Sequence, residues 1–104
     1  MEGAFVIGLD GGTEGVRAAV FDLAGRVLSV SRAEYPTRYP RQGWAEQEPD
    51  DWWAGTARAV RDAVAGAGVP PDAITALSFA GTSCTVVLAD REGRPLRPAL
   101  LWMD

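Results

Sequence analysis

Two short apolar runs open the chain, and the pattern around them predicts a hairpin of strands. Residues 4–9 and 16–21 are mainly apolar, and each run is bounded by Gly or Asp. A polar, glycine-rich stretch joins them. Asp22 and Gly25 then form an Asp-x-x-Gly pattern between apolar flanks, which predicts a tight turn with Gly25 in the left-handed conformation. A third strand is expected over residues 27–33.

One long helix is predicted after residues 35–49, an irregular segment that three prolines and a glycine interrupt. Apolar residues then recur at positions i, i+4, i+7 and i+11 and are expected to face the core: Trp53, Ala57, Val60 and Val64. Trp52 is assigned to the core as well. Pro49 suits the first turn with Glu48 as the N-cap, and two glycines followed by two prolines end the helix.

The second half of the chain predicts two further strands, over residues 74–79 and 85–89. Directly after the second of these strands, residues 90–94 repeat the Asp-x-x-Gly-Arg pattern of residues 22–26. Residues 99–104 form a last apolar, strand-like run with nothing after it to cover it. Because a strand, a helix and another strand make half of an α/β architecture, we expect a fragment of a larger α/β domain.

The composition is that of one ordinary folded domain at most. The chain has 104 residues, of which 47% are hydrophobic and 23% are charged. Its 10 basic and 14 acidic residues give a net charge of −4, which favours neither a nucleic-acid partner nor an anionic membrane. No apolar run approaches the roughly 20 residues that span a bilayer, and no basic-then-apolar leader is seen. We therefore expect a soluble protein of the cytoplasm.

Two missing residue types exclude several kinds of catalysis. The chain has no histidine, and all ten basic residues are arginine. Nucleophiles paired with histidine, imidazole metal ligands, a P-loop lysine and a Schiff-base lysine are therefore excluded within these residues. Proton transfer must fall to carboxylates. The single cysteine, Cys84, excludes an internal disulfide and a thiolate zinc cluster, which fits a reducing cytoplasm.

The segment Asp10-Gly11-Gly12-Thr13, between the first two predicted strands, is the strongest candidate for chemistry. Two adjacent glycines let backbone N–H groups approach an anion closely, and Thr13 adds a hydroxyl donor, so phosphate is the natural ligand. Asp10 is placed to hold Mg²⁺, which would offset the phosphate charge. The alternative interpretation is a hairpin whose glycines serve only the turn.

Four separated segments together resemble the FGGY carbohydrate kinases. They are residues 5–13 (Phe-Val-Ile-Gly-Leu-Asp-Gly-Gly-Thr), residues 16–22, residues 43–49 with Trp52-Trp53, and residues 93–104. The resemblance keeps the family's order and spacing over nearly the whole chain. It implies an α/β fold of the ribonuclease H-like (actin-like ATPase) type, with a mixed sheet that begins as an antiparallel hairpin. It also implies that residues 1–104 are the N-terminal part of the first of two domains.

The resemblance implies roles for particular residues. The first phosphate loop of the family corresponds to Asp10, Gly11, Gly12 and Thr13, with Asp10 on the Mg²⁺ of Mg-ATP and Arg17 as a basic neighbour. A sugar-contacting loop corresponds to Gly81, Thr82, Ser83 and Cys84, and further sugar contacts correspond to Trp102 and Asp104. Small residues that let a strand end pack closely are the alternative interpretation of the loop. Residues 43–47 are interpreted as mainly structural, with Trp44 covering a sheet edge.

The activity implied is ATP-dependent phosphorylation of a sugar, with ATP and Mg²⁺ as cofactors. The family's catalytic base lies beyond residue 104, so this chain alone is expected to be inactive. Residues 81–84 differ from the Gly-Gln-Met-His of xylulose kinases and the Asn-Gln-Arg-Glu of glycerol kinases. The run Thr-Ser-Cys-Thr at residues 82–85 resembles many ribulokinases, which favours a pentulose (ribulose or xylulose) over glycerol.

Two other functions stay open at this point. One is a non-catalytic structural or interaction module that associates with a second copy through unpaired sheet edges, giving a possible homodimer. The other is a different actin-fold ATPase that shares only the first phosphate loop. The tryptophans of residues 44–53 and Trp102 count against the second alternative, because both are sugar-kinase features.

Overall fold

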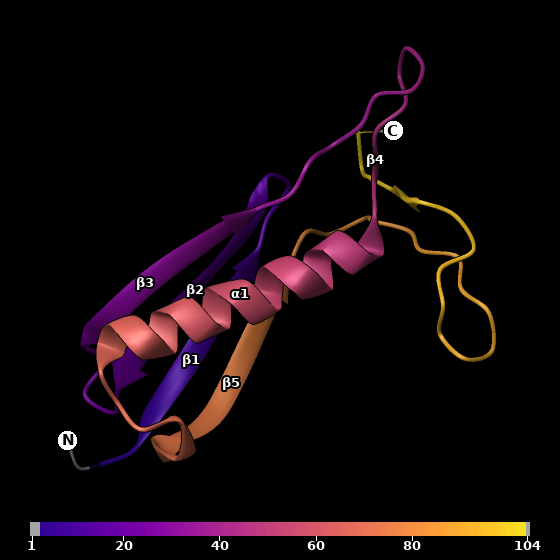
Figure 1. Cartoon of the computed structure of the whole chain (residues 1–104). Coiled ribbons are helices and arrows are strands. Elements are labelled where there is room, and N and C mark those ends of the chain that lie inside the picture. Colours follow the sequence, from indigo (N-terminus) through magenta and orange to yellow (C-terminus); the bar gives the residue numbers. More distant parts are fainter. Residues whose placement is uncertain (1–2, 104) are drawn as a thin grey trace.

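The fold is a four-stranded mixed sheet with one helix across a face and a smaller, looped lobe at one end (Figure 1). The computed structural model describes residues 3–103, so Asp104 lies outside the described residues. The elements in chain order are β1 (Phe5–Gly11), β2 (Gly15–Asp22), β3 (Val27–Glu34), β4 (Glu46–Gln47), α1 (Pro49–Ala67), the 3₁₀ turn η1 (Pro71–Ala73), β5 (Ile74–Gly81) and β6 (Ala99–Leu100).

The strand order in the main sheet is β3-β2-β1-β5. The first three strands are antiparallel neighbours, whereas β5 returns through α1 and pairs with β1 in parallel. This confirms the mixed sheet with an antiparallel hairpin start. Parallel pairing sets Gly11 beside Gly81, so the turn after β1 and the loop after β5 lie next to each other. The strands β3 and β5 are the two edges of this sheet.

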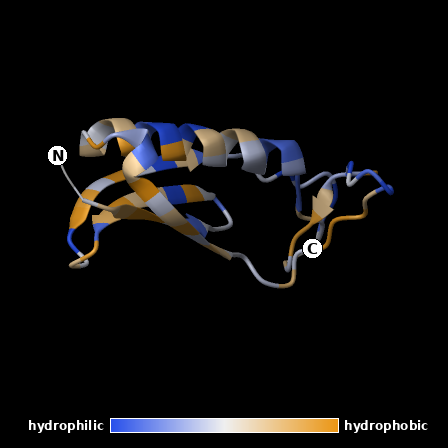
Figure 2. Ribbon diagram, turned by 90° about the horizontal axis from the view of Figure 1, so that it is seen from below, coloured by the Kyte–Doolittle hydropathy of each residue, from blue (hydrophilic) through white to orange (hydrophobic). Residues whose placement is uncertain are grey.

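The core lies between the sheet and α1. Figure 2 shows these two layers, with the helix lying along one face of the sheet. Alternate residues of β1 and β2 are buried beneath the helix: Phe5, Ile7, Leu9, Val16, Ala18 and Val20. Burying a side chain as large as those of Phe, Ile, Leu or Val stabilises the fold by about 1.5–3 kcal/mol. The helix packs mainly on β2 and β3 and leaves β5 largely exposed. Among residues 3–103, no helix has the length and apolar character needed to cross a membrane.

The face that the helix turns to the sheet differs in part from the predicted one. Val60 and Val64 are partly buried against the core, as expected. Its buried residues are Gly55, Ala59 and Ala63, whereas Trp53 is 75% exposed, so the assignment of Trp53 to the core is wrong. Trp52 is partly buried against the core, as expected. Close packing explains the difference, because a side chain at Gly55 would already meet the ring of Tyr35 at 3.4 Å. Small residues bring the helix close to the sheet, and a prediction based on the spacing of large apolar residues does not identify them.

The two Asp-x-x-Gly-Arg turns have the same structure, as their repeated sequence predicts. In each, the aspartate side chain accepts the N–H of the arginine at 2.9 Å: Asp22 from Arg26 and Asp90 from Arg94. Gly25 and Gly93 both adopt left-handed φ, at +86° and +82°. Hydrogen bonds from the arginine backbone are the main reason that the pKa of each aspartate is lowered.

The strand predicted over residues 85–89 is not formed. Instead, this segment makes only isolated bridges, Val86 with Leu100 and Ala89 with Pro95. Its partner segment contains prolines at 95 and 98, which lack the N–H that a continuous ladder requires. The strand-like end of the chain is likewise reduced to the two residues of β6, paired with β4. Buried Glu46 of β4 also forms an ion pair with Arg97, which ties the looped lobe to the strand.

Gly15 is required by the packing of β2 on β3. A Cβ at this position would lie 2.4 Å from the carbonyl oxygen of Ala33 and 3.0 Å from Cα of Glu34, both backbone atoms. In contrast, a Cβ at Gly12 would meet nothing closer than the Gly15 oxygen at 3.5 Å. We expect Gly15→Ala to lower the free energy of unfolding by about 1–3 kcal/mol, measured by urea denaturation. Gly12→Ala is the matched control and should change it by less than about 0.5 kcal/mol; equal losses in the two variants would contradict this packing.

The partly buried Tyr35 hydroxyl should make the free energy of unfolding depend on pH in alkaline solution. Its pKa is raised above 10.0, first because burial disfavours the phenolate and second because Asp10 is near. The folded chain therefore holds the phenol proton more tightly than the unfolded chain does. The contribution of Tyr35 to the free energy of unfolding is complete below pH about 10 and is lost as the pH rises through the pKa of the folded state.

We expect the free energy of unfolding to fall above pH about 10 and the fall to be smaller in Tyr35→Phe. No lysine titrates in this range to obscure the effect. The matched control is Tyr39→Phe, because the Tyr39 side chain is 67% exposed. In this variant the free energy of unfolding should fall with pH as steeply as in the parent chain. Identical slopes for Tyr35→Phe and the parent chain would show that Tyr35 does not cause the loss.

Candidate functional site

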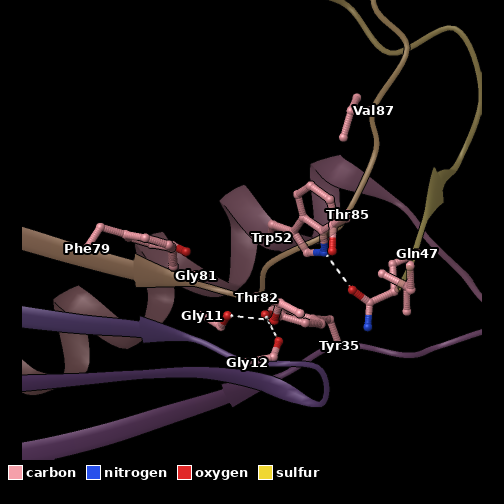
Figure 3. A pocket seen from close by; sticks show the side chains of 12 residues that line it. Gly11, Gly12, Tyr35, Gln47, Trp52, Phe79, Gly81, Thr82, Thr85 and Val87 are labelled. Atoms are coloured by element: carbon pink, nitrogen blue, oxygen red, sulfur yellow. Dashed lines mark hydrogen bonds between the residues drawn. The ribbon is translucent and has the colours of Figure 1, made fainter. Parts of the chain in front are cut away.

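The candidate site surrounds the turn of residues 11–14, which we call the glycine turn, at the carboxyl ends of β1 and β5 (Figure 3). Three pockets border this turn. The main pocket, a cavity of about 280 Å³, lies between the turn, the start of α1 and the loop after β5. The charged pocket lies over β1, β2 and β3 and is lined by Asp10, Gly12, Thr13, Glu14, Gly15, Arg17 and Arg32. The outer pocket shares Thr13 and Glu14 with it and is otherwise lined by residues 34–37, Tyr39, Trp102 and Met103. Ligands of open α/β sheets bind outside the carboxyl ends of the strands, which is where these pockets lie.

Asp10 and Arg17 lie together on the sheet face opposite α1. They are direct partners in the β1–β2 ladder, and their side chains form an ion pair of 3.5 Å. Both remain open to solvent, with side-chain exposures of 60% and 67%. Arg32 of β3 adds a second cation to the lining of the charged pocket. Asp10 is therefore not buried among apolar neighbours, and its carboxylate is available to a ligand.

The two glycines of the turn have different surroundings. Neither has a left-handed φ, so backbone conformation does not require glycine at either position. A Cβ at Gly11 would lie 2.9 Å from the Phe79 ring. At Gly12 a Cβ would make only ordinary contacts, although this residue lines both the main and the charged pocket. The packing of the described residues thus explains Gly11 and does not explain Gly12.

The chemistry of the donor set fits a magnesium–phosphate group. Among residues 3–103, no cluster of three or more metal-ligating side chains is present, so a cation here would rely on Asp10 together with oxygens from its ligand and from water. Mg²⁺ is commonly bound in this way, through one or two carboxylates and substrate phosphates. Arginine side chains and the Thr13 hydroxyl beside Asp10 suit the phosphate oxygens.

The predicted sugar residues are only partly brought together. Gly81 and Thr82 line the main pocket, and Thr82 donates both its N–H and its hydroxyl to the carbonyl of Gly11. Ser83 and Cys84 are exposed and line none of the three pockets, and Cys84 has a left-handed φ of +57°. Trp102 lies in the outer pocket and is 58% exposed. The predicted contact of Asp104 falls outside the described residues.

Three residues of the site are missing from the sequence prediction. Tyr35 and Gln47 line the main pocket, and both donate hydrogen bonds to carbonyls of the glycine turn. Thr85 also lines the main pocket, where its hydroxyl is buried without a partner among the described residues. The sequence offers little to single out Gln47 as a site residue, because it is one of three consecutive polar residues between Trp44 and the helix.

Residues 43–47 are therefore more than a structural connection, because their last residue reaches the site. Trp44, predicted to cover a sheet edge, is 40% exposed, and the Arg41 guanidinium lies over its ring, 5.1 Å from the ring centre. The backbone N–H of Trp44 donates to the Arg41 carbonyl within the loop.

Comparisons with known proteins agree with this geometry. Residues 5–104 match the model of the FGGY family of carbohydrate kinases, N-terminal domain. The chain is 37% identical over 98 residues to a glycerol kinase from Thermococcus onnurineus, which covers 94% of this chain and 20% of that protein. A solved structure described as a xyloylose kinase from Brucella ovis has a TM-score of 0.91 and 34% identity, over 96% of this chain and 21% of that one.

A xylulose kinase structure from Rhodospirillum rubrum is also similar, with a TM-score of 0.86 and 29% identity, over 96% of this chain and 20% of that one. The chain thus spans about a fifth of the length of these relatives. The similar structures confirm the expected actin-like ATPase fold. With a family match that runs from Phe5 through the end of the sequence, the chain belongs to the FGGY family of carbohydrate kinases.

Proposed function

We propose that residues 1–104 are the N-terminal part of the first domain of a kinase that transfers the γ-phosphoryl group of ATP to a sugar hydroxyl. The observation that carries this proposal is Gly12, a pocket-lining glycine that neither backbone conformation nor packing within the described chain requires. A missing side chain at the carboxyl end of parallel strands is what close approach of a phosphate needs. The interpretation that the glycines serve only the turn leaves Gly12 without an explanation.

The charged pocket supports binding of the phosphates in this proposal. Asp10 would hold Mg²⁺, and the Thr13 hydroxyl and Arg17 would donate to phosphate oxygens. Bound Mg²⁺ offsets the negative charge of the phosphate groups. Arg17 pairs with Asp10 at 3.5 Å, and the lining as a whole has two carboxylates, Asp10 and Glu14, and two arginines, Arg17 and Arg32, so bound Mg²⁺ would supply the positive charge that an anion needs.

The main pocket supports a polyhydroxylated substrate. Its polar side chains are neutral, and the buried Thr85 hydroxyl has no partner among the described residues, which suits a sugar hydroxyl. None of its lining residues is a carboxylate. The acceptor for the sugar proton must therefore come from elsewhere in the kinase, and we expect residues 1–104 alone to be inactive.

We propose a pentulose, ribulose or xylulose, as the sugar. The uncharged run of residues 82–85 supports this choice, because it resembles ribulokinases and lacks the charged pair of glycerol kinases. Glycerol is the second candidate, since the Thermococcus onnurineus relative at 37% identity is named a glycerol kinase. Location in the cytoplasm, where ATP is available, and a homodimer through the exposed edge strands remain predictions.

Replacing Gly12 tests the phosphate site. We expect Gly12→Ala, made in the kinase that carries this chain, to raise the KM for Mg-ATP by roughly tenfold or more, because the new methyl group obstructs close approach of the phosphates. The KM for the sugar should change little, and so should the thermal stability. Steady-state kinetics with each substrate varied in turn give these values. An unchanged KM for Mg-ATP would mean that the phosphates bind elsewhere.

Replacing Thr85 tests the sugar site. We expect Thr85→Val, which removes the unpaired hydroxyl at nearly constant volume, to lower kcat/KM for the preferred sugar by roughly tenfold and to leave the KM for Mg-ATP unchanged. Thr75→Val is the matched control, because Thr75 donates to the Phe5 carbonyl at the far end of β5. Ribulose, xylulose and glycerol are compared as substrates. Higher kcat/KM for glycerol would overturn the pentulose assignment and leave the kinase assignment standing.

A further inference from the structure

Three consecutive carbonyl groups of the glycine turn are each held by a different segment of the chain. The Gly11 oxygen accepts the N–H and hydroxyl of Thr82, at 3.0 and 3.1 Å. The Gly12 oxygen accepts the Tyr35 hydroxyl at 2.6 Å. The Thr13 oxygen accepts Nε2 of Gln47, also at 2.6 Å. These donors come from the end of β5, the end of β3 and β4, so the turn is fixed from three sides.

The orientation of the Gln47 amide is determined by its neighbours. Oε1 of Gln47 accepts the indole N–H of Trp52 at 2.8 Å, and an indole N–H can only donate. The amide nitrogen must therefore face the other way, where it has two acceptors for its two hydrogens: the Thr13 carbonyl and the Thr37 hydroxyl oxygen at 2.8 Å. Gln47 is 2% exposed, and all of its polar groups are paired. It is a fully satisfied buried amide and has no freedom to turn.

Holding these carbonyls also fixes the direction of N–H groups. A planar trans peptide points its C=O and the next residue's N–H in opposite directions, and no described peptide bond is cis. Tyr35 on the Gly12 carbonyl therefore orients the N–H of Thr13, and Gln47 on the Thr13 carbonyl orients the N–H of Glu14. Among the described residues, neither of these two N–H groups has an acceptor. Thr13 and Glu14 both line the charged pocket with Asp10.

We propose that Gln47 and Tyr35 are positioning residues for phosphate binding: by holding two carbonyls of the glycine turn, they keep the N–H groups of Thr13 and Glu14 directed at the ligand. This inference rests on the proposed kinase function. Neither side chain lines the charged pocket, and both act through the backbone of the turn. Two oriented N–H groups form an anion-binding concavity that does not have to be ordered again when the phosphate arrives.

The first measurement needs no turnover. Gln47→Met and Tyr35→Phe preserve volume and remove the donors, and ¹⁵N relaxation then reports the backbone order parameters of Thr13 and Glu14. We expect rigid values near about 0.85 in the parent chain and values below about 0.6 for Glu14 in Gln47→Met and for Thr13 in Tyr35→Phe. The matched control is Thr37→Val, which removes the other acceptor of the Gln47 amide and leaves the Thr13 bond intact. It should keep the turn rigid.

The second measurement is made in the kinase that carries this chain. Each variant should raise the KM for Mg-ATP by roughly tenfold, because the N–H groups of the turn are mispositioned. Both side chains also line the main pocket, so the readout that identifies the positioning role is the KM for Mg-ATP taken together with the order of the turn. Trp52→Phe gives an independent check that keeps both donors. It removes the donor to Oε1 of Gln47 and leaves both acceptors of the amide nitrogen in place, so the turn should stay rigid.

The outcomes separate this inference from the function on which it rests. A parent kinase with normal Mg-ATP kinetics, and a turn that stays rigid in Gln47→Met and Tyr35→Phe, would overturn the positioning role alone. A raised KM without any loss of order in the turn would overturn it as well. A parent protein that neither binds nor turns over Mg-ATP would overturn the kinase assignment, and the positioning role with it.

Discussion

Parallel pairing of β5 with β1 is the constraint on which the rest of the site depends. It aligns Gly11 with Gly81, so two loops that are about seventy residues apart in the sequence meet at one edge of the sheet. The hydrogen bonds from Thr82 to the Gly11 carbonyl follow directly from this register. A slip of one residue would turn every side chain of β5 to the opposite face and would remove the Phe79 ring from its place over Gly11.

Local features of the fold could be predicted from the sequence. The two Asp-x-x-Gly-Arg turns are determined by five consecutive residues each, and both form as expected. The hairpin of β1 and β2, the third strand and the helix with Glu48 as N-cap also depend on neighbours in the chain. The phosphate-loop candidates can be named from the sequence for the same reason, since Asp10 to Thr13 are adjacent, and their role in phosphate binding stays a prediction.

Features that depend on distant contacts could not be predicted in this way. The inward face of α1 is set by how closely Gly55 and Ala59 approach the sheet, and hydrophobic spacing does not report that distance. Residues 85–89 lack a ladder because of prolines in a partner segment that the strand's own pattern does not reveal. Gln47 belongs to the site through its hydrogen bonds to the turn and to Trp52, and no local sequence pattern predicts these contacts.

The bonds that hold the glycine turn also determine when during synthesis the turn can become ordered. Its donors lie at residues 35, 47 and 82, so a ribosome that has released only the first hairpin presents a turn with none of its tethers. The loop-closure entropy of the longest link is overcome only after β5 has docked on β1. Nascent chains shorter than this present a glycine turn without its Thr82 tether, and the turn becomes fully ordered together with the completed sheet.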